Sequence, residues 1–316
     1  MEVMVISDTH IHPYARFATT LSNGMNSRSK QILDAVQEAF EFAKNHAIPE
    51  IWHLGDVFHV PGRIEVREFN AFYEMLADVN KAGVRVTLIA GNHDYVSKAS
   101  AENSLKALRS VAKVVWDQVE EMAVGGVPVT FVPWIVWDKF KGGGRGVCVG
   151  HLPVEGAKAD SSEYVPSGGL SVKVFDDYDI TLLGHYHRRQ KVGGKVWYIG
   201  SLVAHDFGET GSEKGFAVLD LSTLKLRFIE TSAPRFYTVS SRMELEEVVK
   251  HPGSYVRVDD LSPGDEEKVR EILANMRAVV FTRKTEDRTE ARLPIEEDTP
   301  LREVIDKYIE LSLIHI

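Results

Sequence analysis

The sequence contains little cysteine and no long hydrophobic run. Its 316 residues include a single cysteine, Cys148, so no disulfide can form within the chain. No stretch of about 18 apolar residues occurs, which argues against a membrane-spanning helix. Residues 1–8 read as a strand, without the basic region and apolar segment of a signal peptide. These absences are typical of a reducing compartment, and we expect a cytoplasmic protein with no membrane partner.

The sequence also lacks an excess of basic residues. Its 37 lysines and arginines face 46 aspartates and glutamates, which gives a formal net charge of −9. Proteins that bind nucleic acids usually carry a basic footprint, because contacts to phosphates drive their affinity. The charge balance therefore argues against strong DNA binding by the surface as a whole. It leaves room for a local basic surface or for bound metal ions, which the count omits.

The spacing of apolar residues changes along the chain. Strand-like runs at residues 3–7, 51–54 and 85–90 alternate with helical spacing at residues 29–46 and 66–80. Further strand-like runs follow up to residue 230, with little helical spacing between them. This order predicts an α/β fold in which a layered β-sandwich domain, residues 1–233, is flanked by helices.

A second pattern begins after residue 233. Alternating strand-like and helical runs predict a small α+β capping domain over residues 234–292, too small to bury much core alone. Residues 293–310 read as a charged linker and the start of an amphipathic helix, whose apolar stripe would suit a groove on a partner. The last six residues, 311–316, match the translation of a sequencing adapter in one reading frame. We interpret them as an artefact that replaces the native C-terminus.

Five short polar clusters each follow a predicted strand. They are Asp8-Thr9-His10, Gly55-Asp56-Val57-Phe58-His59, Gly91-Asn92-His93-Asp94, Gly150-His151 and Gly184-His185-Tyr186-His187. In α/β folds, ligand-binding residues gather at the ends of strands, and carboxylate, amide and imidazole groups suit manganese, iron or zinc better than calcium. Each cluster alone would be interpreted as a turn or loop at the surface. Because six of the twelve histidines fall within them, the clusters together predict a metal centre.

The five clusters, in this order, resemble those of the calcineurin-like metallophosphoesterase superfamily, over about residues 1–231. The resemblance implies two divalent metal ions, with Mn²⁺ expected. The first ion would be held by Asp8, His10, Asp56 and His187, and the second by Asp56, Asn92, His151 and His185. The resemblance makes Asp56 the bridge, since one carboxylate can bind two cations. In such sites the two ions lie about 3.5–4 Å apart and stabilise the attacking and leaving oxygens.

Two further histidines receive roles from the resemblance. His93 would lie near the phosphate, where it protonates the leaving oxygen or steadies its charge. His59 would be a second histidine that faces the substrate without binding metal. Outside the motifs, His53 lies within a predicted strand and is interpreted as packed or hydrogen-bonded, whereas His12 and His205 are left undecided.

The second cluster points to a branch of the superfamily. Protein Ser/Thr phosphatases carry Asp-Arg-Gly after the Gly-Asp, whereas this chain has His59-Val60-Pro61-Gly62. Gly-Asp-x-Phe-His instead resembles the SbcD/Mre-type DNA nucleases, as do Trp197-Tyr198-Ile199-Gly200-Ser201 and Lys214-Gly215-Phe216, and residues 200–209 are similar to phage-encoded members. The resemblance implies a two-metal DNA exonuclease or endonuclease subunit for repair or recombination. It would act as a homodimer with an SbcC/Rad-type ABC ATPase.

Two other functions stay open. A small-molecule phosphodiesterase or phosphatase could use the same dinuclear site, and the acidic charge balance favours it. A scaffold with a degenerate site is disfavoured because every ligand residue is intact. Basic residues beside the fifth cluster could hold DNA phosphates, or could equally form a solvated turn; they are Arg188, Arg189, Lys191 and Lys195.

Overall fold

The structure is a computed structural model of the 316-residue chain. It describes residues 1–159, 164–259 and 266–282. Residues 283–292 of the predicted capping domain, the predicted linker and helix of residues 293–310, and the tail of residues 311–316 lie outside the described residues. Within the described ranges, no helix combines the length and apolar character needed to cross a membrane.

The first sheet combines four strands from the N-terminal part of the chain with two strands that come later in the sequence. Its six strands lie in the order β14-β13-β1-β2-β3-β6. Their bounds are β1 Glu2–Ile6, β2 Glu50–His53, β3 Arg85–Ile89, β6 Lys113–Val115, β13 Gly215–Asp220 and β14 Lys225–Glu230. Strands β1, β2, β3 and β6 run parallel, so their carboxyl ends meet at one edge. Strand β13 returns antiparallel beside β1 and closes this sheet with β14.

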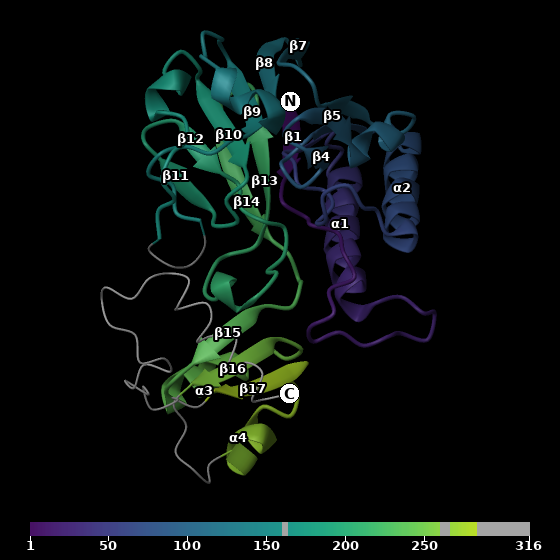
Figure 1. Ribbon diagram of the computed structural model, residues 1–316, viewed down its shortest axis with the longest axis vertical. Helices are drawn as coiled ribbons and strands as arrows, with labels where there is room; N and C mark the ends of the chain where they lie inside the picture. Colours follow the sequence, from purple (N-terminus) through teal and green to yellow (C-terminus); the bar gives the residue numbers. More distant parts are fainter. Residues whose placement is uncertain (160–163, 260–265, 283–316) are drawn as a thin grey trace, which may run out of the picture.

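Two helices cover one face of the first sheet: α1, Ser27–Asn45, and α2, Val66–Lys81 (Figure 1). Helix α1 begins at an N-cap, where the side chain of Asn26 accepts hydrogen bonds from the backbone N–H groups of residues 28 and 29. Its apolar stripe packs on the sheet and contributes the largest core cluster, which includes Ile32, Val36 and Phe40.

The second sheet packs against the other face of the first. Its strands lie in the order β11-β12-β10-β9-β8-β7. Their bounds are β7 Glu120–Val124, β8 Val127–Val132, β9 Val147–His151, β10 Ile180–Gly184, β11 Gln190–Val192 and β12 Val196–Tyr198. Alternation along β1 explains the sandwich, because Val3 and Val5 pack toward the second sheet while Met4 and Ile6 pack toward the helices. The predicted α/β sandwich flanked by helices is confirmed.

Short elements connect these layers. A two-stranded hairpin, β4 Tyr95–Ser97 and β5 Ser100–Asn103, follows the third polar cluster. The remaining pieces are 3₁₀ helices: η1 Ser104–Leu108, η2 Trp134–Lys139, η3 Val172–Phe175 and η4 Phe207–Glu209. Segment η3 helps to cover the outer face of the second sheet, where Phe175 and Tyr178 form a further core cluster.

A small α/β unit follows the sandwich (Figure 1). It contains β15 Phe236–Val239, α3 Arg242–Val248, β16 Tyr255–Asp259, α4 Glu266–Ile272 and β17 Ala278–Thr282. Its three strands are parallel and bury their own apolar cluster. Phe236 and Tyr255 pack with Phe207 of the sandwich, and Gln31 of α1 donates to the Tyr255 hydroxyl at 2.8 Å. The boundaries predicted from the sequence, 1–233 and 234–292, stay a prediction.

Candidate metal centre

The five polar clusters converge at one end of the sandwich. Loops after β1, β2 and β3 of the first sheet meet the ends of β9 and β10 of the second sheet, since both sheets direct these carboxyl ends to the same side. All seven residues predicted to bind metal lie there: Asp8, His10, Asp56, Asn92, His151, His185 and His187. The strand ends therefore bring together residues that are far apart in sequence.

Asp56 lies between two groups of donors. Its Oδ2 is 3.5 Å from His10 Nε2 on one side and 3.4 Å from His151 Nε2 on the other. On the first side, His10 Nε2 faces His187 Nε2 at 3.0 Å. On the second side, Asn92 Oδ1 is 3.0 Å from His151 Nε2 and 2.9 Å from His185 Nδ1. The arrangement fits a carboxylate shared between two sites.

The donors suit divalent metal ions. The ligand atoms of Asp8, His10 and His187 lie within 4.8 Å of one another, and so do those of Asp8, Asp56 and His151. Burial lowers the pKa of His10 well below its usual range, so its ring is neutral at pH 7 and keeps a lone pair for a metal. A buried set of carboxylate, amide and imidazole groups is the kind that holds manganese, iron or zinc.

The pKa of His151 reports the negative charge of this cluster. Burial alone would lower it, but the nearby Asp56 carboxylate raises it to about 9. The Nδ1–H of His151 donates to the carbonyl oxygen of Leu54 at 2.7 Å, which directs Nε2 toward Asp56. A proton on Nε2 therefore occupies the position at which a metal ion would bind, and metal binding would displace it.

Four of the predicted ligand residues have left-handed backbone conformations. Their φ angles are 50° for Asp8, 44° for His10, 54° for Asp56 and 103° for His185. A residue with a side chain rarely adopts such angles, and each costs on the order of 1–3 kcal/mol. The surrounding hydrogen bonds hold them; for example, the Asp8 carboxylate accepts from the backbone N–H of His185 at 3.1 Å. These backbone conformations therefore direct the predicted ligand side chains toward the centre.

A buried aspartate joins the second and third loops. The Asp94 carboxylate, fully buried, accepts hydrogen bonds from the backbone N–H groups of Gly91, Val57 and Phe58 at 3.0, 3.1 and 3.2 Å. These two loops also approach closely, because a Cβ on Gly91 would stand 2.2 Å from Asp56 Oδ1. Position 91 therefore requires glycine for space.

Glu209, which was not among the residues predicted for the site, supports His187. His187 Nδ1 donates to Glu209 Oε1 at 2.7 Å, and Glu209 Oε2 pairs with Lys214 Nζ at 2.5 Å. Both charged side chains are buried. Burial alone would raise the pKa of Glu209, but Lys214 and His187 hold it well below its usual range. The carboxylate fixes the ring so that Nε2 faces the centre. In the sequence, Glu209 and Lys214 stood out only because residues 200–209 and Lys214-Gly215-Phe216 resemble segments of the nuclease family.

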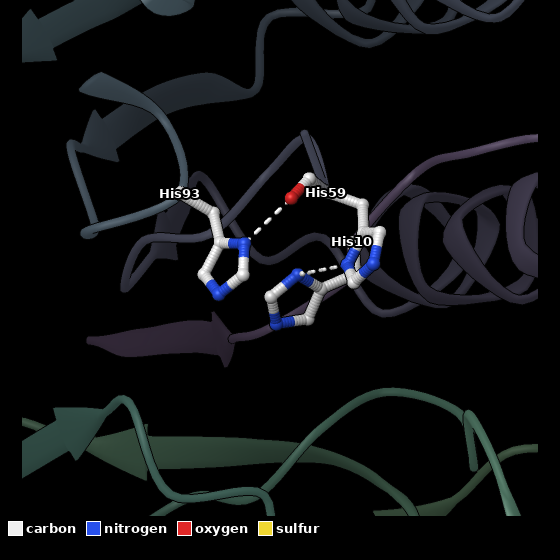
Figure 2. Close-up of side chains that lie close together, drawn as sticks. All are labelled: His10, His59 and His93. Carbon is white, nitrogen blue, oxygen red and sulfur yellow. Dashed lines mark hydrogen bonds between the residues drawn. The ribbon is translucent and has the colours of Figure 1, made fainter. Parts of the chain in front are cut away.

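Both predicted catalytic histidines lie beside His10 (Figure 2). His93 Nδ1 donates to the backbone oxygen of His59 at 2.5 Å, and its backbone N–H donates to Asp56 Oδ1 at 2.8 Å. His59 Nδ1 is 3.3 Å from His10 Nδ1. Burial lowers the pKa of His59 to about 4, so this ring is neutral at pH 7. The structure places both side chains at the centre, and their roles stay a prediction.

Three further histidines lie close to the centre. His53 is buried and its Nε2 contacts Thr9 Oγ1 at 3.0 Å, in agreement with a packed, hydrogen-bonded residue. His12 lies at the edge, with its ring 5.3 Å from that of His59. His205 was left undecided and lies inside: its Nε2–H donates to the carbonyl oxygen of Asp8 at 3.1 Å.

Three of the basic residues beside the fifth cluster have protein partners. Arg189 pairs with Glu213 and lies over a phenylalanine ring. Lys191 lies over the ring of Trp197, and Lys195 donates to two backbone carbonyls at 2.9 and 2.8 Å. The protein itself engages these three side chains, which favours a structural role over one in holding DNA; Lys191 lies in strand β11 rather than in the turn that was the alternative.

Comparisons with known proteins agree with this geometry. The profile of the calcineurin-like phosphoesterase family matches residues 1–189. Exonuclease subunit 1 of Enterobacteria phage T4 is 25% identical over 207 residues, which cover 62% of this chain and 60% of that protein. The SbcD subunit of nuclease SbcCD from Staphylococcus epidermidis is 32% identical over 85 residues, 25% of this chain and 23% of that protein.

Solved structures give a weaker likeness. A dimetal phosphatase from Danio rerio is 11% identical, covers 73% of this chain and 96% of its own, and has a TM-score of 0.45. The family profile spans more than half of the chain and includes all five polar clusters. On this match and on the predicted ligands that meet around Asp56, the chain belongs to the calcineurin-like phosphoesterase family.

Proposed function

We propose that this chain is a two-metal DNA nuclease subunit that hydrolyses phosphodiester bonds. One observation carries the proposal: Asp56 Oδ2 stands 3.5 and 3.4 Å from imidazole nitrogens of two donor groups. The first ion would be held by Asp8, His10, Asp56 and His187, and the second by Asp56, Asn92, His151 and His185. When bound, two Mn²⁺ ions would stabilise the negative charge that develops on the oxygens at phosphorus.

The protein's own groups would then orient the substrate and move a proton. His93 is held at two points, by its backbone N–H on Asp56 and by its Nδ1–H on the backbone oxygen of His59. With the Nδ1–H engaged, Nε2 would carry the second proton of the charged ring, donate it to the leaving oxygen and leave a neutral imidazole. His59, neutral at pH 7, would face the substrate without repelling the metal ions.

DNA as the substrate is supported by the relatives and by the shape of the site. The two protein relatives are named as an exonuclease subunit and a nuclease subunit. A cavity of about 610 Å³ extends from the predicted metal ligands to Phe236 of the small unit, more room than a single phosphodiester needs. The chain spans 60% and 23% of the lengths of these relatives, so the activity of the whole protein is itself part of the proposal.

The word "subunit" in both names also motivates a proposed assembly. We propose that the chain works as a homodimer with an SbcC/Rad-type ATPase in DNA repair or recombination. Residues 300–310, which would carry the contact to the ATPase, lie outside the described residues. A small-molecule phosphodiesterase is the second candidate, favoured by the net charge of −9.

A manganese-dependent assay separates the two candidates. Linear double-stranded DNA, single-stranded DNA and bis(p-nitrophenyl) phosphate would be compared at equal enzyme concentration. The nuclease proposal expects cleavage of DNA that EDTA abolishes and that Asp56→Asn strongly reduces. Asp78→Asn, which removes an exposed carboxylate on α2, is the matched control and should leave all rates unchanged. Hydrolysis of the small ester with no cleavage of either DNA would instead support the second candidate.

A further inference from the structure

One wall of the cavity beside the metal centre carries a buried arginine. Arg28 is the second residue of α1, and its side chain lines the same cavity as His10, His59 and His187. The residue is only 3% exposed. Burying a charged group is costly unless it is paired and hydrogen-bonded. A guanidinium in this position therefore needs partners.

The protein supplies only some of them. Arg28 Nη2 donates to the backbone oxygen of His205 at 2.9 Å. Aromatic rings surround the guanidinium, with its central carbon 4.9 Å from the ring centroid of Phe236, 5.1 Å from Tyr255 and 5.3 Å from Tyr14. Over the described ranges of the chain, no carboxylate forms an ion pair with Arg28. Since a guanidinium has five N–H donors, most of its hydrogen-bonding capacity is left for something in the cavity.

A second polar atom on this wall also lacks a partner. His205 lines the cavity and is 8% exposed, and its buried Nδ1 has no hydrogen bond within the described part of the chain. Because Nε2–H donates to the Asp8 carbonyl, Nδ1 is left as an acceptor. A hydrated phosphate would satisfy both residues, because its oxygens accept from Arg28 and a bound water can donate to His205 Nδ1.

The position of this wall relative to the metal centre fits an extended substrate. The ring centroid of His205 is 5.1 Å from that of His10 and 5.3 Å from that of His187, while its backbone oxygen holds Arg28. His205 therefore lies between Arg28 and the predicted metal ligands. A group bound there would be joined to the reacting phosphodiester but distinct from it.

We propose that Arg28 binds the backbone phosphate next to the phosphodiester at the metal centre. This inference rests on the proposed nuclease function and adds a subsite to it. Arginine is suited to the role because its planar fork can bind two phosphate oxygens at once, and the aromatic rings hold the fork in position. The subsite would recognise a polynucleotide strand through a charge that a single phosphodiester lacks.

A structural role for Arg28 makes a different prediction. Arg28 also contacts the small unit through Phe236 and Tyr255, so its loss could loosen that unit. Gln31, one turn further along α1, bonds Tyr255 as well but lies outside this cavity. Gln31→Met is thus a matched control that weakens the same contact without touching the proposed subsite.

The test measures kcat/KM of the manganese-loaded protein on an oligonucleotide and on bis(p-nitrophenyl) phosphate. Arg28→Met should lower the ratio of the two values by about 10–100-fold, as expected for a charge-assisted hydrogen bond, and Arg28→Lys should restore part of it. The slope of log(kcat/KM) on the oligonucleotide against log salt should also become shallower by about one, the change for one lost phosphate contact. Gln31→Met should change neither quantity.

Each of the other possible results contradicts one part of the proposal. If Arg28→Met lowers kcat/KM on both substrates by the same factor, or changes neither value, the subsite does not exist. If Gln31→Met reproduces the effect of Arg28→Met, Arg28 only fastens the small unit. If the unmodified protein hydrolyses the small ester but no oligonucleotide, the proposed nuclease function fails and this inference fails with it. Metal content and melting temperature of each variant show whether it is folded.

Discussion

Replacing Lys214 with methionine tests the buried charges behind His187. The ammonium group is almost fully buried and has three acceptors: Glu209 Oε2 at 2.5 Å, Ser201 Oγ at 2.8 Å and the His187 carbonyl at 2.9 Å. Lys214→Met would leave the Glu209 carboxylate buried with only His187 beside it as a partner of opposite charge. Removing one partner of a buried ion pair typically costs about 3–5 kcal/mol. Because whole domains are stable by only about 5–15 kcal/mol, we expect a large loss of stability.

The second partner gives the decisive comparison. Glu209→Gln should also destabilise, since it leaves the Lys214 ammonium buried without its carboxylate, although the amide oxygen can still accept from His187 Nδ1. Lys214→Met combined with Glu209→Gln removes both charges. The double variant should therefore lose less free energy of unfolding than the sum of the single losses, by about 2 kcal/mol or more.

Urea unfolding of all four proteins in EDTA would measure these free energies, because the chelator removes any contribution from metal binding. Single losses that add up within about 0.5 kcal/mol, or a Lys214→Met variant that loses less than about 1 kcal/mol, would refute the reasoning. The charges would then be solvated in solution rather than dependent on each other.

Three further substitutions test the metal centre. Asp56→Asn should lower the content of both ions, measured by elemental analysis after manganese loading; if the unmodified protein holds fewer than one ion, the two-metal assignment is wrong. His93→Ala should keep its metals but lower kcat by about 10²–10⁴-fold, and loss of metal would make His93 a ligand. Gly91→Ala should weaken metal binding, measured by calorimetry, because its Cβ would stand 2.2 Å from Asp56 Oδ1. Gly194→Ala, with open space around it, is the control, and equal affinities would show that the loop can yield.

The grouping of these residues could be predicted from the sequence because each polar cluster is a short local motif. Each polar cluster directly follows an apolar strand, and the carboxyl ends of parallel strands meet at one edge. The uninterrupted apolar run of β1 likewise predicts a strand buried on both faces, which a sandwich with helices provides. Residue type and strand order were therefore enough to bring Asp8, Asp56 and His151 to one place.

The supporting residues could not be predicted in the same way. Glu209 and Lys214 look like surface charges until β13 is seen to return beside β1, a pairing between the two ends of the sandwich that no local pattern encodes. Arg28 lies among charged and polar residues at the start of a helix, where exposure is the usual outcome. Their burial depends on contacts between segments far apart in the chain.

The left-handed conformations of four predicted ligand residues affect how the sequence of this chain can change. Asp8, His10, Asp56 and His185 each occupy backbone angles that glycine adopts without steric cost. Selection for thermal stability alone would favour residues that relax these loops, at the expense of the ligands. A library screened only for heat resistance should therefore accumulate substitutions at these four positions. A library screened for metal-dependent hydrolysis should retain them and gain stability elsewhere.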